Sequence, residues 1–241
     1  MHLFISGGTK GIGAATVRKF IDNGFNASVL YSSDEAAKDV LLEDLSDHAD
    51  NLLFIKADVS DPSAVKDAVA SAVSKFGDID VAVSNAGISY VGLADTFDHS
   101  DYRKIMDINF GGFFNLVHEI IPSMVKNKKG NIVAVSSMWG QKGASCEALY
   151  SATKGAVDSY VKSLSKELGP SGIRVNAVSP GVIKTDMLDC FTEDDLNELS
   201  EETSLGRLGD PSEVADLIFY LSSPQSSFIT GQIVGIDGGF L

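Results

Sequence analysis

Short apolar runs alternate with longer amphipathic stretches along the whole chain. The apolar runs are rich in β-branched residues and read as strands at 2–6, 27–31, 52–56, 81–84, 131–136, 174–179 and 232–236. Between them lie helical stretches of roughly 12 to 25 residues, which favours parallel strands joined by helices. Continuous apolar strands are expected where helices cover both faces of a sheet. The pattern predicts a single α/β domain over residues 1–241, with seven strands and six main helices.

One segment departs from this alternation. Residues 185–209 contain no strand and carry "CFTEDDLNELSEET", which reads as a short helical insertion. Long insertions in compact domains often act as lids over a site. We therefore expect a substrate loop or lid at about 185–209.

Composition and charge narrow the class of protein. Hydrophobic residues make up 44% and charged residues 22%, which is ordinary for a soluble globular domain. The net charge of −14, with no block of Lys and Arg, argues against nucleic acid or an anionic membrane as the main partner. The first strand begins at once, which leaves no room for a secretory signal, and no apolar run is long enough to span a membrane. We expect a cytoplasmic protein.

Cysteines and histidines suggest no special chemistry. Cys146 and Cys190 form neither a close pair nor part of a metal-like cluster, and the four histidines are scattered. We expect two reduced thiols and no metal site.

A glycine-rich turn opens the first βα unit. "SGGTKGIG" at 6–13 places Gly7, Gly11 and Gly13 in a GxxxGxG pattern between the first strand and an amphipathic helix. Backbone N–H groups and the helix dipole make such a turn an anion site, although a plain tight turn is the alternative.

The end of the second strand bears on the choice of cofactor. NAD sites usually place an Asp or Glu there, on the ribose hydroxyls. Here Tyr31 and Ser32 occupy the strand end, and no carboxylate follows before Asp34. Lys10, within the glycine turn, is in a position to meet a 2′-phosphate. These features favour NADPH over NADH; in the alternative, Lys10 is solvated and Asp34 fills the acidic role.

Polar residues also follow the third and fourth strands, and ligands of parallel sheets lie beyond the carboxyl ends of strands. Asp58 is placed to accept from an adenine amino group with Val59 against the ring, or is an ordinary Asp at a strand-to-helix turn. "SNAG" at 84–87 is small and polar, so backbone can run beside a cofactor there, and Asn85 can tie strands together.

The stretch "LYSATKG" at 149–155 sets Tyr150 and Lys154 one helical turn apart. Alone, this pair is typical of an exposed helix. In order along the chain, however, Gly7-x-x-x-Gly11-Ile12-Gly13, Asn85-Ala86-Gly87, Asn109, Ser137, Tyr150-x-x-x-Lys154 and "SPGVIKT" at 179–185 resemble the motifs of the short-chain dehydrogenases/reductases. The resemblance covers essentially the full length. It implies a Rossmann fold, usually assembled as a homotetramer or homodimer.

The resemblance also implies roles for four residues. Tyr150 would donate a proton to a carbonyl oxygen as hydride arrives, and Ser137 would orient that oxygen. Lys154 would hold the ribose and lower the pKa of Tyr150, because a nearby cation favours the phenolate. Asn109, expected within a long helix, would hold a water that relays protons to Lys154.

The cofactor contacts implied by the motifs involve backbone as well as side chains. The backbone of Ile183 and the hydroxyl of Thr185 would meet the nicotinamide carboxamide and the phosphate. The full set of expected cofactor-binding residues is Gly7, Thr9, Lys10, Gly11, Ile12, Gly13, Tyr31, Ser32, Asp58, Val59, Asn85, Ala86, Gly87, Tyr150, Lys154, Pro180, Gly181, Ile183 and Thr185.

Two ketone substrates remain open. The whole chain looks most like 3-oxoacyl-[acyl-carrier-protein] reductases, for which a basic patch of Lys126, Lys128 and Lys129 would dock the carrier. Ser171, however, stands where those reductases usually have a second basic residue. In a narrower stretch, "SSMWGQKGASCEALYSATKGA" resembles reductases of a 5-aminopentanone group on translation elongation factor P.

In that second case Glu147 would meet the substrate ammonium; otherwise it stabilises a helix dipole in the first turn. Expected substrate contacts are Ser89, Trp139, Glu147 and Met187. A nucleotide-bound regulator without activity is the non-enzyme alternative, which the presence of both Tyr150 and Lys154 disfavours.

Overall fold

The apolar runs form one parallel sheet in a computed structural model that describes residues 1–189 and 191–240. The strand order is β3-β2-β1-β4-β5-β6-β7. The strands are β1 (His2–Ser6), β2 (Asn26–Tyr31), β3 (Leu52–Lys56), β4 (Val81–Ser84), β5 (Gly130–Val135), β6 (Ile173–Pro180) and β7 (Ile233–Ile236). All neighbours are parallel, so the predicted doubly wound Rossmann-type sheet is confirmed. The order reverses between β1 and β4, and such a switch point opens a crevice for ligands.

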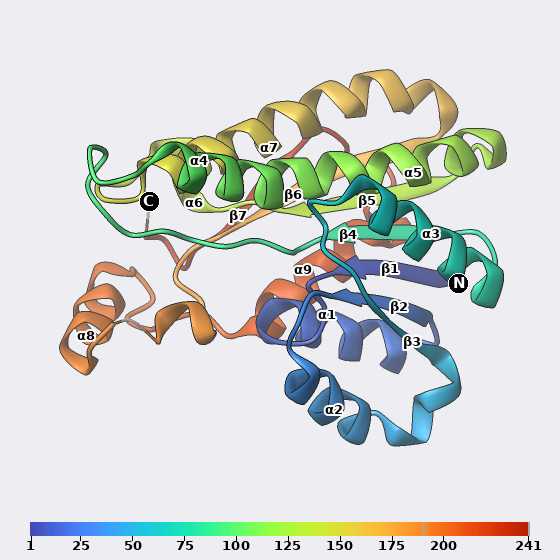
Figure 1. The fold of residues 1–241 in the computed structure, drawn as a ribbon, viewed down its shortest axis with the longest axis horizontal. Coiled ribbons are helices and arrows are strands. Elements are labelled where there is room, and N and C mark those ends of the chain that lie inside the picture. The colour runs from blue at the N-terminus through green and yellow to red at the C-terminus, as the bar shows by residue number, and fades with distance from the viewer. Residues whose placement is uncertain (190, 241) are drawn as a thin grey trace.

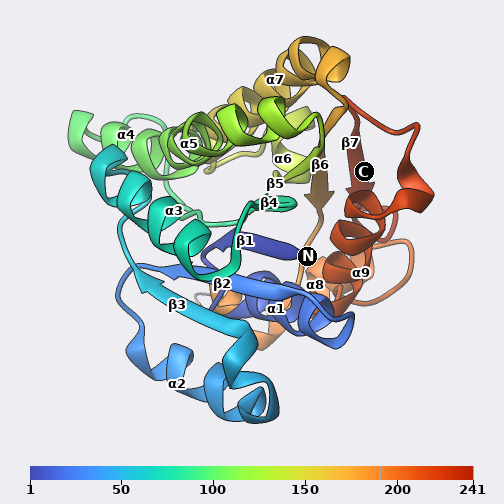
Figure 2. The ribbon, with the colours of Figure 1, turned by 90° about the vertical axis from the view of Figure 1, so that its right-hand side faces the viewer.

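Helices cover both faces of the sheet (Figures 1 and 2). One layer contains α1 (Gly11–Asp22), α2 (Glu35–Asp44) and α9 (Pro211–Ser222). The other contains α3 (Pro62–Phe76), α4 (His99–Met106), α5 (Gly112–Asn127) and α7 (Ala148–Leu168). Phe4 of β1 packs into the second layer, and its neighbours Leu3 and Ile5 pack into the first. This alternation explains why the strands read as continuous apolar runs.

Two regions differ from a simple alternation of strands and helices. The long helix expected around Asn109 is divided: α4 ends at Met106, a π-helical turn spans Asp107–Gly111, and α5 follows. The insertion contains a 3₁₀ turn (Asp186–Leu188) and α8 (Glu193–Glu202), which projects from the carboxyl end of the sheet in Figure 1. Cys190 lies outside the described residues. Within them, no helix combines the length and apolar character needed to cross a membrane.

Candidate active site

The glycine-rich turn has the backbone geometry of an anion site. Gly7 and Gly11 have φ of +64° and +52°, a region that favours glycine. A Cβ at Gly13 would lie 2.1 Å from the Gly7 carbonyl oxygen. α1 begins with extended backbone at Lys10, and no side chain caps its first turn in the described structure. Its N–H groups therefore remain for an anion beyond β1.

Asn85 joins this turn to β4. Its side-chain amide donates to the Gly7 carbonyl oxygen at 2.7 Å. The backbone N–H groups of Asn85 and Ala86 both donate to the Ser6 hydroxyl, at 3.2 Å. The two strands at the switch point are thus held together as the sequence predicts for Asn85.

A cleft of about 470 Å³ runs from this turn across the ends of β2 and β3. It brings together most of the expected nucleotide contacts. They are Gly7, Thr9, Lys10, Gly11, Ile12, Tyr31, Ser32, Asp58, Val59, Asn85, Ala86, Gly87 and Thr185. The glycine backbone at one end of the cleft and the apolar Val59 and Ile108 at the other fit the size and chemistry of a dinucleotide.

The Lys10 ammonium forms ion pairs with two carboxylates. It lies 3.4 Å from Asp34 and 3.0 Å from Asp186. Asp34 also caps α2 by accepting from the backbone of Ala37. Exposed pairs of this kind contribute little to stability and exchange readily with other partners. Lys10 thus connects the glycine turn, the start of α2 and the first turn of the insertion.

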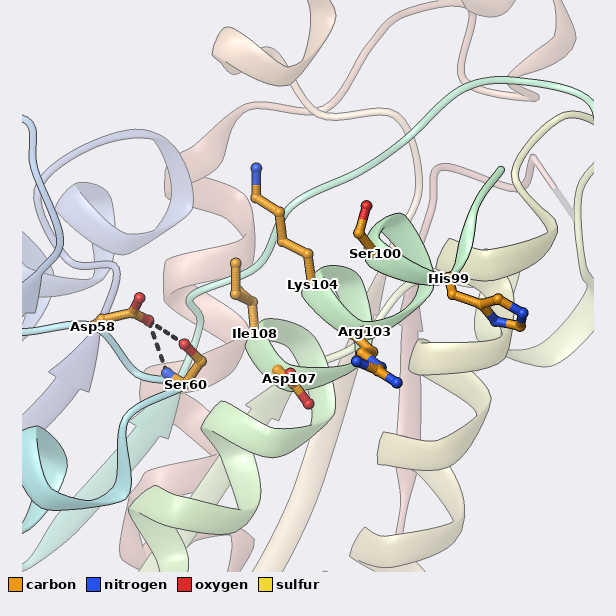
Figure 3. A pocket seen from close by; sticks show the side chains of 8 residues that line it. All are labelled: Asp58, Ser60, His99, Ser100, Arg103, Lys104, Asp107 and Ile108. Atoms are coloured by element: carbon orange, nitrogen blue, oxygen red, sulfur yellow. Dashed lines mark hydrogen bonds between the residues drawn. The ribbon is translucent and has the colours of Figure 1, made fainter. Parts of the chain in front are cut away.

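Asp58 serves the local turn as well as lining the cleft. One of its oxygens accepts from the backbone and hydroxyl of Ser60, at 2.8 and 2.7 Å. This is the turn role weighed as the alternative for Asp58; the adenine contact stays a prediction. Figure 3 shows the hollow beside it, about 740 Å³, lined on the other side by α4 with His99, Arg103 and Lys104.

A second cavity of about 460 Å³ adjoins the cleft. Ile12, Asn85, Gly87, Thr185 and Met187 line both, so the two form one continuous space. Of the expected catalytic and substrate residues, the second cavity is lined by Ser89, Ser137, Trp139, Glu147, Tyr150, Lys154 and Met187. Pro180, Gly181 and Ile183 close it from the end of β6.

Tyr150, Lys154 and Ser137 converge in the second cavity, and the Lys154 ammonium lies beside Gly87, which lines both spaces. The Lys154 ammonium lies 5.5 Å from the centre of the Tyr150 ring and donates to the Val135 carbonyl oxygen at 2.9 Å. The Ser137 hydroxyl accepts from the backbone of Trp139 at 3.2 Å and hydrogen-bonds the Tyr150 phenol. The end of β5 thus positions both polar partners of the α7 pair.

The pKa of Tyr150 differs from the expected lowered value. Burial raises the pKa of Tyr150 to about 12, and the Ser137 hydrogen bond opposes this rise only in part. Burial also lowers the pKa of Lys154 to about 8. The reason is that both groups are removed from water, which disfavours their charged forms, and that the ammonium donates to a carbonyl and not to the phenol. Tyr150 therefore keeps its proton at neutral pH.

Asn109 is buried in the π-helical turn, with 3% of its surface exposed. Its amide nitrogen donates to the Ile88 carbonyl oxygen and to the Thr153 hydroxyl, and its oxygen accepts from the Ile88 backbone. Both amide N–H groups have protein partners. The side chain ties the loop after β4 to α7, next to Lys154; the water relay stays a prediction.

Glu147 is the acidic group of the second cavity. Its carboxylate accepts from the Ser89 hydroxyl at 3.1 Å and from the Trp139 side chain. Burial raises the pKa of Glu147 above its usual range. Trp139 also packs edge-on against Phe240, with ring centres 5.8 Å apart.

Several apolar residues of the cavity were not predicted. They are Tyr90 and Val91 from the loop after β4, and Leu188, Phe191 and Leu199 from the insertion. In the sequence, Leu188, Phe191 and Leu199 show only an apolar spacing. The same spacing is expected for the buried side of any short helix, so it does not indicate a cavity wall. In the structure, the insertion contributes a wall of the cavity.

Comparison with known proteins agrees with this geometry. The family model described as Enoyl-(Acyl carrier protein) reductase matches residues 7–241. The chain is 40% identical to an uncharacterized oxidoreductase, YmfI, of Bacillus subtilis, over 98% of this chain and 97% of that protein. It is 36% identical to the 3-oxoacyl-[acyl-carrier-protein] reductase FabG of Chlamydia muridarum, over 98% and 95%. A solved structure, ElxO with NADP bound, superposes with a TM-score of 0.92 at 33% identity, covering 99% of this chain and 98% of that one.

A parallel Rossmann-type sheet with a Tyr, Lys and Ser site beside a nucleotide cleft defines an oxidoreductase. The chain belongs to the short-chain dehydrogenase/reductase family, as its motifs predict. Family members use nicotinamide cofactors.

Proposed function

We propose that this protein reduces a ketone to a secondary alcohol with NADPH, and that Tyr150, Ser137 and Lys154 carry out the reaction. The observation that carries the proposal is their convergence in a cavity that adjoins the cleft beyond the glycine-rich turn. A nicotinamide cofactor bound in the cleft would supply the hydride.

The chain's own residues handle the proton and the carbonyl oxygen. Tyr150, whose raised pKa keeps it protonated, donates its proton to that oxygen. Ser137 donates a second hydrogen bond to the same oxygen and orients it. Lys154, below its pKa of about 8, carries a positive charge that stabilises the phenolate left behind. Asn109, bonded to the neighbouring Thr153 from the π-helical turn, would hold the relay water.

The preference for NADPH rests on the end of β2. Tyr31 and Ser32 bring no carboxylate there, and Lys10 lies at the rim of the same cleft. A 2′-phosphate would replace the carboxylates of Asp34 and Asp186 as the partner of Lys10. The NADP bound to ElxO supports this choice. Lys10→Ala is expected to raise the KM for NADPH at least several-fold and leave that for NADH nearly unchanged; equal effects on both would contradict the phosphate contact.

A 3-oxoacyl thioester on an acyl carrier protein is the first substrate proposed. FabG of Chlamydia muridarum, similar along nearly its whole length, supports it. The proposed docking patch is smaller than the sequence suggests, because Lys129 pairs with Asp80 at 2.7 Å. Ser171, in the 3₁₀ turn Gly169–Ser171, supplies no charge.

Glu147 favours a second candidate, a ketone that carries an ammonium group. A partly buried carboxylate in an apolar cavity is costly unless a cation or several donors meet it. Ser89 and Trp139 provide two donors, and no cation of the described residues pairs with Glu147. The 5-aminopentanone group of elongation factor P has the required chemistry.

NADPH oxidation with two substrates tests both candidates. Acetoacetyl thioester and aminopentanone-modified elongation factor P are compared in wild type and in Glu147→Gln. Turnover of the thioester, unaffected by Glu147→Gln, supports the first candidate. Turnover of the modified factor, lost at least tenfold in Glu147→Gln, supports the second. NADPH binding without turnover of any ketone would instead support a nucleotide-bound regulator.

Two further features of the working enzyme are proposed. The segment 185–209 closes over substrate as a lid, because Phe191 and Leu199 already line the cavity. The protein assembles as a homotetramer or homodimer, because large apolar side chains such as Tyr102, Phe114 and Val125 are exposed on α4 and α5.

A further inference from the structure

Asp158 is a buried carboxyl group that the reaction described above does not use. It lies on α7 one turn beyond Lys154 and two turns beyond Tyr150, so the three share one face of the helix. Only 5% of its surface is exposed. In the described part of the chain, its Oδ1 is the buried side-chain oxygen or nitrogen without a hydrogen-bond partner. Such a group is costly to bury, so its presence calls for a physical reason.

The neighbours of Asp158 connect it to the catalytic strand end. The Ser136 hydroxyl, directly before Ser137 at the end of β5, lies against the carboxyl and donates to the Lys154 backbone carbonyl oxygen at 3.5 Å. Gly140 of α6 (Met138–Lys142) packs so closely that a Cβ there would lie 3.0 Å from the Asp158 Oδ2 and 2.9 Å from the Lys154 backbone carbon. α6 therefore packs directly against the Asp158 carboxyl and the Lys154 backbone.

The charged groups that act on Asp158 come from its own helix. They are Lys154 and the exposed Lys162, while α6 and β5 present the uncharged Gly140 and Ser136. Burial raises the pKa of Asp158, and the Ser136 hydroxyl and the two lysines oppose that rise.

The buried Lys154 ammonium, in turn, is stabilised by a nearby negative charge. Lys154 is 4% exposed, and the one hydrogen bond recorded for its ammonium goes to the Val135 carbonyl oxygen. A buried ammonium loses its proton easily unless a negative charge lies near. Asp158 lies one turn away on the same face of α7, and Gly140 packs against both residues; its negative charge favours the protonated form of Lys154.

We propose that Asp158 is a positioning residue of the catalytic pair, which keeps the buried Lys154 ammonium charged from one turn further along α7. The effect of Asp158 on catalysis depends on the proposed role of Lys154 in the reaction. The electrostatic statement holds for the cofactor-free protein, whatever the substrate is.

The test is the titration of Lys154 itself, followed by NMR of ¹⁵N- and ¹³C-labelled lysine side chains in cofactor-free protein. Lys154→Arg assigns the signal. We expect a pKa of about 8 in wild type and a value about 1 unit lower in Asp158→Asn. Glu167→Gln, which removes an exposed carboxylate from the same helix, should leave the titration unchanged. An unchanged Lys154 pKa in folded Asp158→Asn would overturn the proposal.

A second variant is available if Asp158→Asn does not fold. Asp158→Ser removes the charge with a smaller neutral side chain and is measured in the same way. In either folded variant, the alkaline limb of kcat/KM for ketone reduction should move to lower pH by the same shift. A loss of kcat with no movement of this limb, and with the Lys154 pKa unchanged, would leave Asp158 a purely structural residue. If no ketone is reduced, the proposed function fails while the Lys154 titration still decides the role of Asp158.

Discussion

At the scale of single residues, the site contains two side chains whose charged forms the interior disfavours. Tyr150 retains its proton because burial raises the pKa of its phenol, and Lys154 is close to losing its own because burial lowers the pKa of its ammonium. A high phenol pKa suits a proton donor, since the acid form is present throughout the neutral range. In the proposed reduction, the protonated phenol is the form that donates to the carbonyl oxygen.

Tyr150→Phe tests the donor. The ring and its packing remain, but the hydroxyl that meets Ser137 is lost. Turnover of any accepted ketone should fall by about 10²- to 10⁴-fold, the usual contribution of a general acid. NADPH affinity, measured by fluorescence titration, should stay within about twofold. A parallel loss of cofactor affinity would instead make Tyr150 a structural residue.

Lys154→Met tests the cost of the buried ammonium. A lysine pKa lowered from 10.5 to about 8 destabilises the fold by up to about 3 kcal/mol below pH 8. This cost is fully present below pH 8 and disappears as the pH rises toward 10.5. Lys154→Met should therefore raise the free energy of unfolding at pH 7 by about 1–3 kcal/mol, since the lost bond to Val135 offsets part of the gain.

Denaturant unfolding of wild type and Lys154→Met at pH 7 and pH 10 measures this difference. The gain should shrink at the higher pH, while ketone turnover is lost at both. An unchanged or lower stability at pH 7 would show that the ammonium is better solvated or paired than its burial indicates.

At the scale of elements, the site depends on strand ends and the turns that follow them. The turn after β1 brings glycine backbone against β4, the end of β5 supplies Ser136 and Ser137, and α7 presents Tyr150, Lys154 and Asp158 on one face. The insertion after β6 adds the apolar wall. Each element has its own local sequence signal, but the distances between them come from the packing of the sheet.

Gly13→Ala tests the glycine turn. The added Cβ would lie 2.1 Å from the Gly7 carbonyl oxygen, so the turn and the start of α1 must move apart. We expect the NADPH dissociation constant to rise at least tenfold and the free energy of unfolding to fall by about 1–3 kcal/mol. Gly169→Ala is the matched control, because a Cβ there meets nothing within 4 Å. Equal behaviour of the two variants would contradict the packing argument.

The surface of the whole molecule combines a net charge of −14 with several exposed apolar side chains. The charge keeps the surface repulsive toward most acidic partners. Phe114, 45% exposed on α5, packs against His118 one turn further along α5 and against Tyr160 of α7, and forms an apolar area that a second copy can cover.

Phe114→Asp tests this face. Wild type should elute as a dimer or tetramer, and the variant should dissociate to smaller species by light scattering, because a charge would be buried in the interface. Val40→Asp on α2, which is 58% exposed, should leave the mass unchanged. A monomeric wild type, or an unaffected Phe114→Asp, would exclude this face as the interface.

The strands and the family membership could be predicted from the sequence alone. Apolar runs separated by amphipathic stretches define the strands because periodicity and β-branched residues act locally, and the observed strand bounds lie within a residue or two of those predicted. The glycine turn, Asn85, Ser137, Tyr150 and Lys154 could be found from motifs, because the chemistry requires those residue types at those spacings.

The environment of these groups could not be predicted from the motifs, because it depends on how the chain folds. The raised pKa of Tyr150, the burial of Lys154, the two carboxylates at Lys10 and the unpartnered oxygen of Asp158 depend on segments far apart in the chain. Solvation and charge fall off over a few ångströms in space, not over positions in sequence. For that reason the motifs identified the reacting groups, whereas packing set their protonation and the walls of the cavity around them.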